Sequence, residues 1–210
     1  LQNADGGWPT FCRGWGHLPF DQSCPDITAH ALRALHIAAD GTRPRIRTAT
    51  ETGLRYLAEH QGDFGSWLPL WFGNQHVDHG SNPVLGTSRV LVALALCAPA
   101  GQMTAAGLEY LKESQNPDGG WGGAAGIVST TEETAIAVLA IVNWPERAEG
   151  ALANGIHYLL NRIEEDAWDE PAPIGLYFAS LWYSERLYPL LWTTEALART
   201  VEISQNHKHS

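Results

Sequence analysis

Hydrophobic residues along most of the chain recur at spacings of three and four positions, which is the pattern of amphipathic and buried helices. In chain order, the predicted helices begin at Asp26 and at Thr48 and then span residues 86–98, 104–114, 129–143, 147–162 and 187–203. No segment alternates convincingly between hydrophobic and polar positions, so the sequence predicts no strand. The fold class is therefore expected to be all-α.

Nearly wholly apolar helices alternate with half-polar ones along this series. A helix that is apolar almost all round must be buried, so we expect the apolar helices inside and the half-polar ones outside. That arrangement is a two-layer (α/α) barrel (toroid), of which about seven helices form an incomplete part. Residues 1–203 are expected to make one domain and residues 204–210 a disordered tail. Capping-box patterns place two helix starts, at Thr48 with Glu51 and at Ser129 with Glu132.

A short motif that joins glutamine to tryptophan recurs after the half-polar helices. Residues 2–8 read Gln-Asn-Ala-Asp-Gly-Gly-Trp, and residues 115–121 repeat this sequence with proline in place of the alanine. Residues 61–67 keep the spacing from Gln to Trp, and residues 162–168 keep only the Trp at the same position. Successive tryptophans lie 59, 54 and 47 residues apart, close to the range of repeat architectures. We predict a structural role, clamping the barrel, for Gln2, Trp8, Gln61, Trp67, Gln115, Trp121 and Trp168.

Composition and charge narrow the possible functions. The 210 residues carry a net charge of −10, which argues against a generally basic surface for nucleic acid. The longest uncharged apolar run, residues 90–100, is about half of a bilayer span. The three cysteines are widely and irregularly spaced, and His76, Asp78 and His79 are poorly spaced for a metal. We therefore expect a reduced, intracellular protein with no metal, no other cofactor and no nucleic-acid partner.

The Gln…Asp-Gly-Gly-Trp repeat makes the chain resemble the C-terminal half of squalene–hopene cyclases and related triterpene cyclases. Three further matches follow in chain order. Pro25–His30 resembles the family's Asp-x-Thr-Ala-x segment, and residues 65–71 and 86–87 resemble its Gly-Ser-Trp…Trp…Tyr-Gly-Thr stretch. Residues 177–199 resemble its terminal aromatic segment. The matches span nearly the whole chain. The resemblance implies an enzyme that protonates squalene or a related linear isoprenoid and steers the carbocation through ring closures.

The family's proton donor lies in an Asp-x-Asp-Asp motif, and no segment of this sequence has that spacing. In the family the motif lies upstream of the position that matches Leu1, so we expect a C-terminal piece that is inactive alone. Its expected partners are the isoprenoid, the cyclase chain upstream of Leu1 and a second copy in a homodimer. The family also implies peripheral (monotopic) contact with the cytoplasmic membrane, which at this net charge an apolar patch would have to mediate.

Asp26 and His30 form the sharpest local constellation. Four residues apart on a helix, they share a face and are expected to be able to hydrogen-bond. An adjacent carboxylate favours the protonated form of a histidine. The resemblance implies that this histidine strengthens the donor acid, so both residues are candidate catalytic residues. The alternative is that Asp26 only caps its helix and His30 is an ordinary interior histidine.

Aromatic faces stabilise a carbocation without forming a bond to it. By their match to family motifs, the candidate residues that bind substrate or carbocation are Phe11, Trp71, Leu85, Tyr177, Phe178 and Tyr183. Ordinary core packing is the competing interpretation for each aromatic residue. Leu85 stands where the family usually has a tyrosine of the acid's hydrogen-bond network.

Two other functions compete with a cyclase. A non-catalytic α/α toroid that binds a lipid or a protein would explain both Leu85 and the missing acid motif, because a fold alone does not decide function. A zinc-dependent barrel of the protein-prenyltransferase type needs Asp, Cys and His ligands that converge. Cys12, Cys24 and Cys97 lack the surrounding signatures of that family.

Overall fold

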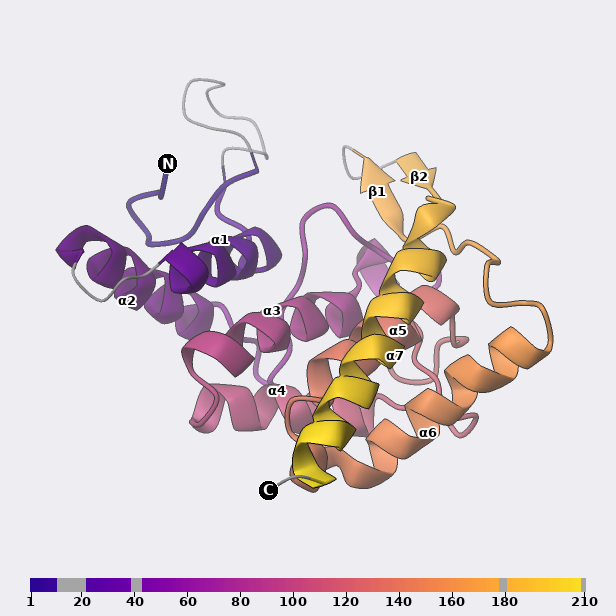
Figure 1. Cartoon of the computed structure of the whole chain (residues 1–210). Helices are drawn as coiled ribbons and strands as arrows, with labels where there is room; N and C mark the ends of the chain where they lie inside the picture. The colour runs from indigo at the N-terminus through magenta and orange to yellow at the C-terminus, as the bar shows by residue number, and fades with distance from the viewer. Residues whose placement is uncertain (11–21, 39–42, 178–180, 209–210) are drawn as a thin grey trace.

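The computed structural model describes residues 1–10, 22–38, 43–177 and 181–208, which form seven α-helices, a short 3-10 helix and a two-stranded sheet (Figure 1). The α-helices are α1 (Pro25–Ala38), α2 (Pro44–Glu59), α3 (Pro83–Cys97), α4 (Gln102–Glu113), α5 (Thr131–Ile141), α6 (Pro145–Glu164) and α7 (Leu187–Lys208). The strands are β1 (Gly175–Tyr177) and β2 (Leu181–Tyr183), and the 3-10 helix is η2 (Asp78–Gly80). None of the described helices is long and apolar enough to cross a bilayer.

The α-helices form two layers. Helices α1, α3, α5 and α7 pack on one another in that order, while α2, α4 and α6 each pack on the odd-numbered helix before them (Figure 1). Burial follows the layers, since every residue of α5 is buried whereas α6 buries only three. The prediction of an all-α fold with apolar helices inside and half-polar ones outside is thus confirmed, and the described helices form part of an (α/α) barrel.

Helices α2 and α3 begin three or four residues earlier than their sequence patterns indicated. Helix α2 starts at Pro44, because proline presets the backbone angle of a first helical residue and has no N–H to satisfy. Thr48 therefore lies inside α2, and its carbonyl accepts a bond from the Thr52 hydroxyl at 3.0 Å. Helix α3 likewise starts at a proline, Pro83, and Asn82 caps it through a 3.0 Å bond from Leu85 N to Asn82 Oδ1.

The capping box of α5 lies one residue later than predicted. Thr130, rather than Ser129, is the N-cap, and its Oγ1 accepts from Glu133 N at 3.1 Å. The Thr130 hydroxyl also donates to the Glu133 carboxylate at 2.9 Å, so the box uses Glu133 instead of Glu132. The displaced Ser129 hydroxyl donates instead to Asp118, in the turn of the third repeat motif.

The glutamines of the repeat tie each turn to the following outer helix. The amides of Gln2, Gln61 and Gln115 donate to the turn carbonyls of Gly6, Gly65 and Gly119, and also to carbonyls of Ala49 in α2, Met103 in α4 and Ala151 in α6. The six distances lie between 2.6 and 3.0 Å. The glycines of the turns at Gly6, Gly65 and Gly119 have positive φ, which a residue with a side chain rarely adopts.

Two tryptophans of the repeat, Trp67 and Trp121, each join three helices. Trp121 Nε1 donates to Leu111 O of the preceding outer helix at 2.7 Å, and Trp121 N donates to Thr134 Oγ1 of the inner helix at 2.9 Å. Its ring packs against Gly155 of the next outer helix, where a Cβ would lie 2.7 Å from it. Trp67 makes the equivalent bonds to Leu57 and Thr87 and packs on Gly107, while Trp8 bonds Thr28 and packs on Gly53. We call each such Gln–Trp unit a clamp.

The C-terminal segment departs from the sequence prediction in two ways. First, β1 and β2 pair as an antiparallel ladder with Tyr177 opposite Leu181, although no strand was predicted. Strands of three residues are too short to show alternation in the sequence. A side chain at position 175 would collide with the Tyr183 ring, so the pairing of the two strands requires glycine there. Second, α7 continues past Ile203 to Lys208 and so takes in most of the segment expected to be disordered. A formed helix gains one backbone bond with each added residue, which allows a polar end to stay helical.

Candidate active site

Asp26 lies in the first turn of α1, where only 3% of its surface is exposed. Its Oδ1 accepts a hydrogen bond from the Cys24 thiol, and Cys24 Sγ accepts one from Leu70 N at 3.2 Å. Burial raises the pKa of Asp26, while hydrogen bonds to the carboxylate and the charge of Arg89 act in the opposite direction. Burial, followed by the Asp26 charge, also raises the pKa of Cys24, so this thiol is a structural donor rather than a nucleophile.

His30 stands one turn further along α1 and is exposed, but the expected bond to Asp26 is absent. No hydrogen bond joins the two side chains in the described part of the chain, because the Asp26 carboxylate bonds Cys24 instead. Surrounding protein atoms, and then the positive charges of Arg89 and Arg33, lower the pKa of His30. This lowering of the pKa opposes the cationic form of His30 that the sequence suggested.

Arg89 is the cation that α3 places among these groups. Its guanidinium carbon lies 4.7 Å from the centroid of the Trp192 ring. Burial lowers its pKa, while Asp26 of α1 and Glu195 of α7 act in the opposite direction. A guanidinium does not lose its proton in a protein, so it remains a fixed positive charge where α1, α3 and α7 meet. We call this region, defined by Asp26, His30, Arg89 and Trp192, the charged wall.

Three aromatic rings that sequence reasoning missed adjoin the charged wall. Tyr188 and Trp192, one turn apart on α7, are stacked with centroids 4.5 Å apart. Phe72, in the loop before α3, lies 6.0 Å from Tyr188 and 6.2 Å from Trp192. Two features of the sequence could have found this region. Tyr188 and Trp192 are one helical turn apart in a predicted helix, and Arg89 is the one charged residue in the apolar helix predicted at 86–98. No pattern in the sequence indicates that Phe72 packs near Tyr188 and Trp192.

The aromatic residues predicted from the resemblance lie at several places. Trp71 precedes Phe72 in the chain and is half-buried, and its Nε1 donates to Thr10 Oγ1. Tyr183 is 39% exposed in β2 and hydrogen-bonds to Tyr188. Leu85 is fully buried in the first turn of α3. Tyr177 is described by its backbone in β1 alone, while Phe11 and Phe178 lie outside the described residues.

A second polar cluster, also missed, surrounds two buried glutamates at the start of α5. The carboxylate of Glu133 accepts bonds from Asn74 Nδ2 at 3.0 Å and from the α3 cap Asn82 at 2.7 Å. Glu132 accepts from Ala172 N at 2.7 Å, and its other oxygen has no partner within the described chain. Burial raises the pKa of each glutamate to about 7. Together they fix the loops before α3 and before β1.

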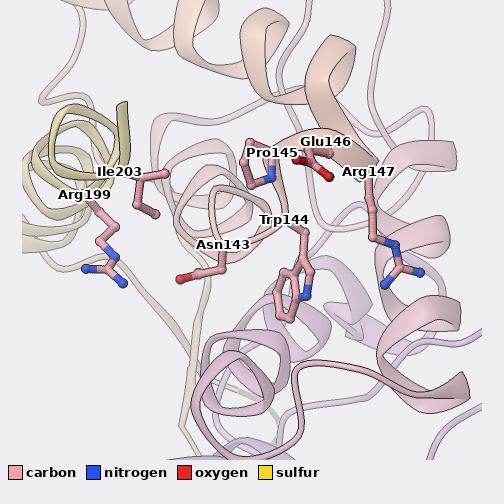
Figure 2. Close-up of a pocket in the computed structure, with 7 residues that line it drawn as sticks. All are labelled: Asn143, Trp144, Pro145, Glu146, Arg147, Arg199 and Ile203. Atoms are coloured by element: carbon pink, nitrogen blue, oxygen red, sulfur yellow. The ribbon is translucent and has the colours of Figure 1, made fainter. Parts of the chain in front are cut away.

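Three cavities accompany these elements. One of about 280 Å³ lies between the inner helices and is lined by Arg33, Leu139, Glu195 and Arg199, among others. One of about 120 Å³ lies between the two loops that the glutamates fix. One of about 380 Å³ lies where α5 meets α6, with Trp144 between Arg147 and Arg199 (Figure 2), and contains none of the predicted site residues. Among the described residues no group of three potential ligands could hold a metal ion.

Comparisons with known proteins agree on one family. Residues 16–202 match the model of the squalene-hopene cyclase C-terminal domain. The chain is 29% identical to a squalene–hopene cyclase of Bradyrhizobium diazoefficiens, over 87% of this chain and 30% of that protein. It is 32% identical to a drimenyl diphosphate synthase of Streptomyces showdoensis, over 79% of this chain and 29% of that protein. An ent-copalyl diphosphate synthase from Streptomyces platensis shares the fold, with a TM-score of 0.64 and 22% identity over 95% of this chain and 36% of that one.

Proposed function

Because the chain belongs to the squalene-hopene cyclase C-terminal domain family, we propose that it builds one wall of the active site of a terpene cyclase. The reaction is the cyclisation of squalene or a related linear isoprenoid, started by protonation of an alkene. The observation that carries this proposal is the charged wall together with the Phe72 and Tyr188 rings beside it. An acid network and π faces are the two things that a carbocation reaction needs from its protein.

The acid itself is proposed to come from another part of the polypeptide. The chain spans about 30% of the length of the cyclase relative, which leaves ample room for an Asp-x-Asp-Asp motif elsewhere. Asp26 and His30 then act on that acid as accessory groups, through hydrogen bonds and charge. On this proposal the 210 residues alone are catalytically inactive.

The aromatic residues are proposed to stabilise the cation as it moves along the substrate. Phe72 and Tyr188 join the earlier candidates Trp71, Tyr177 and Tyr183, and each ring facing a desolvated cation contributes about 2 kcal/mol. Trp192 is excluded from this role, because its ring already contacts the Arg89 guanidinium and the Tyr188 ring.

The substrates named for the relatives differ in polarity, so the test must offer both kinds. The whole protein is incubated with squalene and, separately, with farnesyl and geranylgeranyl diphosphates, and products are identified by mass spectrometry. A cyclised product that falls by about a hundredfold or more in His30→Ala supports the proposal. The control is His157→Ala, in the outer helix α6. No product from any of the substrates, with an intact acid motif, would favour a non-catalytic toroid that binds a lipid or a protein.

Contact with the membrane is a separate part of the proposal. Linear isoprenoids dissolve in bilayers, so the whole protein is proposed to collect its substrate at a membrane surface through an apolar patch. The net charge of −10 on these 210 residues argues against attraction of this part by anionic lipid. Sedimentation with neutral and with anionic vesicles should therefore give equal binding, and binding that needs anionic lipid would contradict it.

A further inference from the structure

Cys24 is a buried thiol at the start of α1, where three segments of the chain meet. It directly precedes Pro25, the first residue of α1, and only 2% of its surface is exposed. Its backbone N–H donates to the carbonyl of Trp8, in the first clamp, at 3.1 Å, and its carbonyl accepts from Thr28 N at 2.9 Å. The backbone that carries the thiol is therefore held by hydrogen bonds on both sides.

The thiol of Cys24 acts both as a donor and as an acceptor. Its S–H donates to Asp26 Oδ1, two residues further along the chain, and Sγ accepts from Leu70 N at 3.2 Å. Burial, followed by the charge of Asp26, raises the pKa of Cys24. The group therefore keeps its proton, and the hydrogen stays available to the carboxylate.

These two hydrogen bonds connect two parts of the candidate active site. Asp26 belongs to the charged wall, whereas Leu70 directly precedes Trp71 and Phe72 in the chain. The loop that carries these two rings is thus fastened to the first turn of α1 through one sulfur atom. Loss of the thiol would remove a donor from a buried carboxylate and a partner from the Leu70 amide, and both losses are unfavourable in a protein interior.

We propose that Cys24 is a positioning residue of the active site, whose thiol orients the Asp26 carboxylate and holds the loop of Trp71 and Phe72 against it. The inference rests on the proposed function for its role in catalysis, although the hydrogen bonds themselves do not depend on that function. Cys24 acts through Asp26 and through the loop, and no bond to its sulfur is made or broken in the reaction.

The donor has a further effect on the charge of Asp26. A hydrogen bond to a carboxylate stabilises its ionised form, whereas burial of Asp26 favours the protonated one. In Cys24→Ala the pKa of Asp26 should therefore rise by about one pH unit. Cys24→Ser keeps an O–H donor and should hold that pKa at or below its value in the unchanged protein.

The direct test is the S–H stretching band of Cys24 in infrared spectra of the whole protein, assigned by the band that is lost in Cys24→Ser. A thiol that donates to a carboxylate absorbs at a lower frequency than a weakly bonded one. Cys97, whose Sγ lies 3.7 Å from Leu32 O, is the internal reference and is assigned with Cys97→Ala. We expect the Cys24 band below that of Cys97.

A second spectrum asks whether Asp26 is the acceptor. In Asp26→Asn the Cys24 band should move toward the Cys97 band, because an amide oxygen accepts less strongly than a carboxylate. A Cys24 band that coincides with the Cys97 band in the unchanged protein, or one that stays in place in Asp26→Asn, overturns the proposal.

Activity distinguishes positioning from a purely structural role. In the active protein, Cys24→Ala should lower kcat by about tenfold or more with little change in KM, and should move the acidic limb of the pH–rate profile upward by about one unit. Cys24→Ser should recover most of kcat. Cys97→Ala, which removes a thiol from the end of α3, should change neither kcat nor the profile.

The possible failures are distinguishable. A loss of stability in Cys24→Ala with kcat and the pH profile unchanged would overturn the positioning role. The absence of any cyclised product from the unchanged protein counts against the proposed function, whereas the infrared bands still decide whether the thiol donates to Asp26.

Discussion

The clamps and the charged wall are both built around tryptophan, yet they use it in opposite ways. In a clamp, the indole N–H of Trp121 donates to the Leu111 carbonyl and the ring packs against Gly155. In the charged wall, Trp192 faces a guanidinium and a second ring. The clamp recurs with equivalent partners, whereas the wall occurs once. The repeated Gln–Trp contacts stabilise the fold, whereas the proposed reaction site is built from contacts that do not repeat.

The largest expected effect comes from breaking a clamp at its centre. Trp121→Ala should lower the free energy of unfolding by about 3–5 kcal/mol, because it removes a fully buried ring and leaves the Leu111 carbonyl without its donor. Urea titration of the whole protein measures the change. Trp8→Ala is the matched control, and the smaller loss expected there follows from its partial exposure. Equal losses at the two sites would show that burial is not the source of the effect.

The two buried glutamates, Glu132 and Glu133, predict how the stability of the fold depends on pH. Burial raises each pKa from about 4.5 to about 7, so the folded protein binds more protons than the unfolded chain between these values. Stability should therefore be highest below pH 4.5 as far as these groups are concerned, and should fall as pH rises through 7. In Glu132→Gln the fall should be shallower, since a neutral amide does not titrate. Thermal unfolding at pH 5, 6, 7 and 8 gives the slope, and an identical slope in the variant would contradict this account.

The smallest effect tests the glycine under the clamp. Gly155→Val should destabilise the protein by about 1–3 kcal/mol, because its Cβ would meet both the Trp121 ring and Val138 at 2.7 Å. Gly150, five residues earlier in the same helix, has nothing within 4 Å of such a Cβ. Gly150→Ala should therefore be neutral or stabilise by up to about 1 kcal/mol, since alanine favours a helix. The sign difference between the variants, measured by urea titration, is the decisive observation.

What the sequence predicted well depended on local patterns. The helices and their two layers follow from apolar spacing within ten to fifteen residues, and the clamps follow from a motif that repeats. The start of α2 at Pro44 and the N-cap of α5 at Thr130 were missed because neighbouring residues offered competing caps. The charged wall could not be predicted, because Arg89 and Trp192 are more than a hundred residues apart and only the tertiary fold brings them together. His30 was found by motif, but its charge depends on that same long-range packing.

The short reach of the clamps also bears on how the chain is assembled during translation. Gln2, Gln61 and Gln115 find their distant carbonyls 47, 42 and 36 residues further along the chain. At about 5–20 residues per second, a ribosome delivers each partner within about ten seconds of the glutamine. Each repeat can thus close soon after it leaves the exit tunnel, before the next is complete. The contact of Arg89 with Trp192 must wait for the last helix, so the clamps can form before the charged wall does.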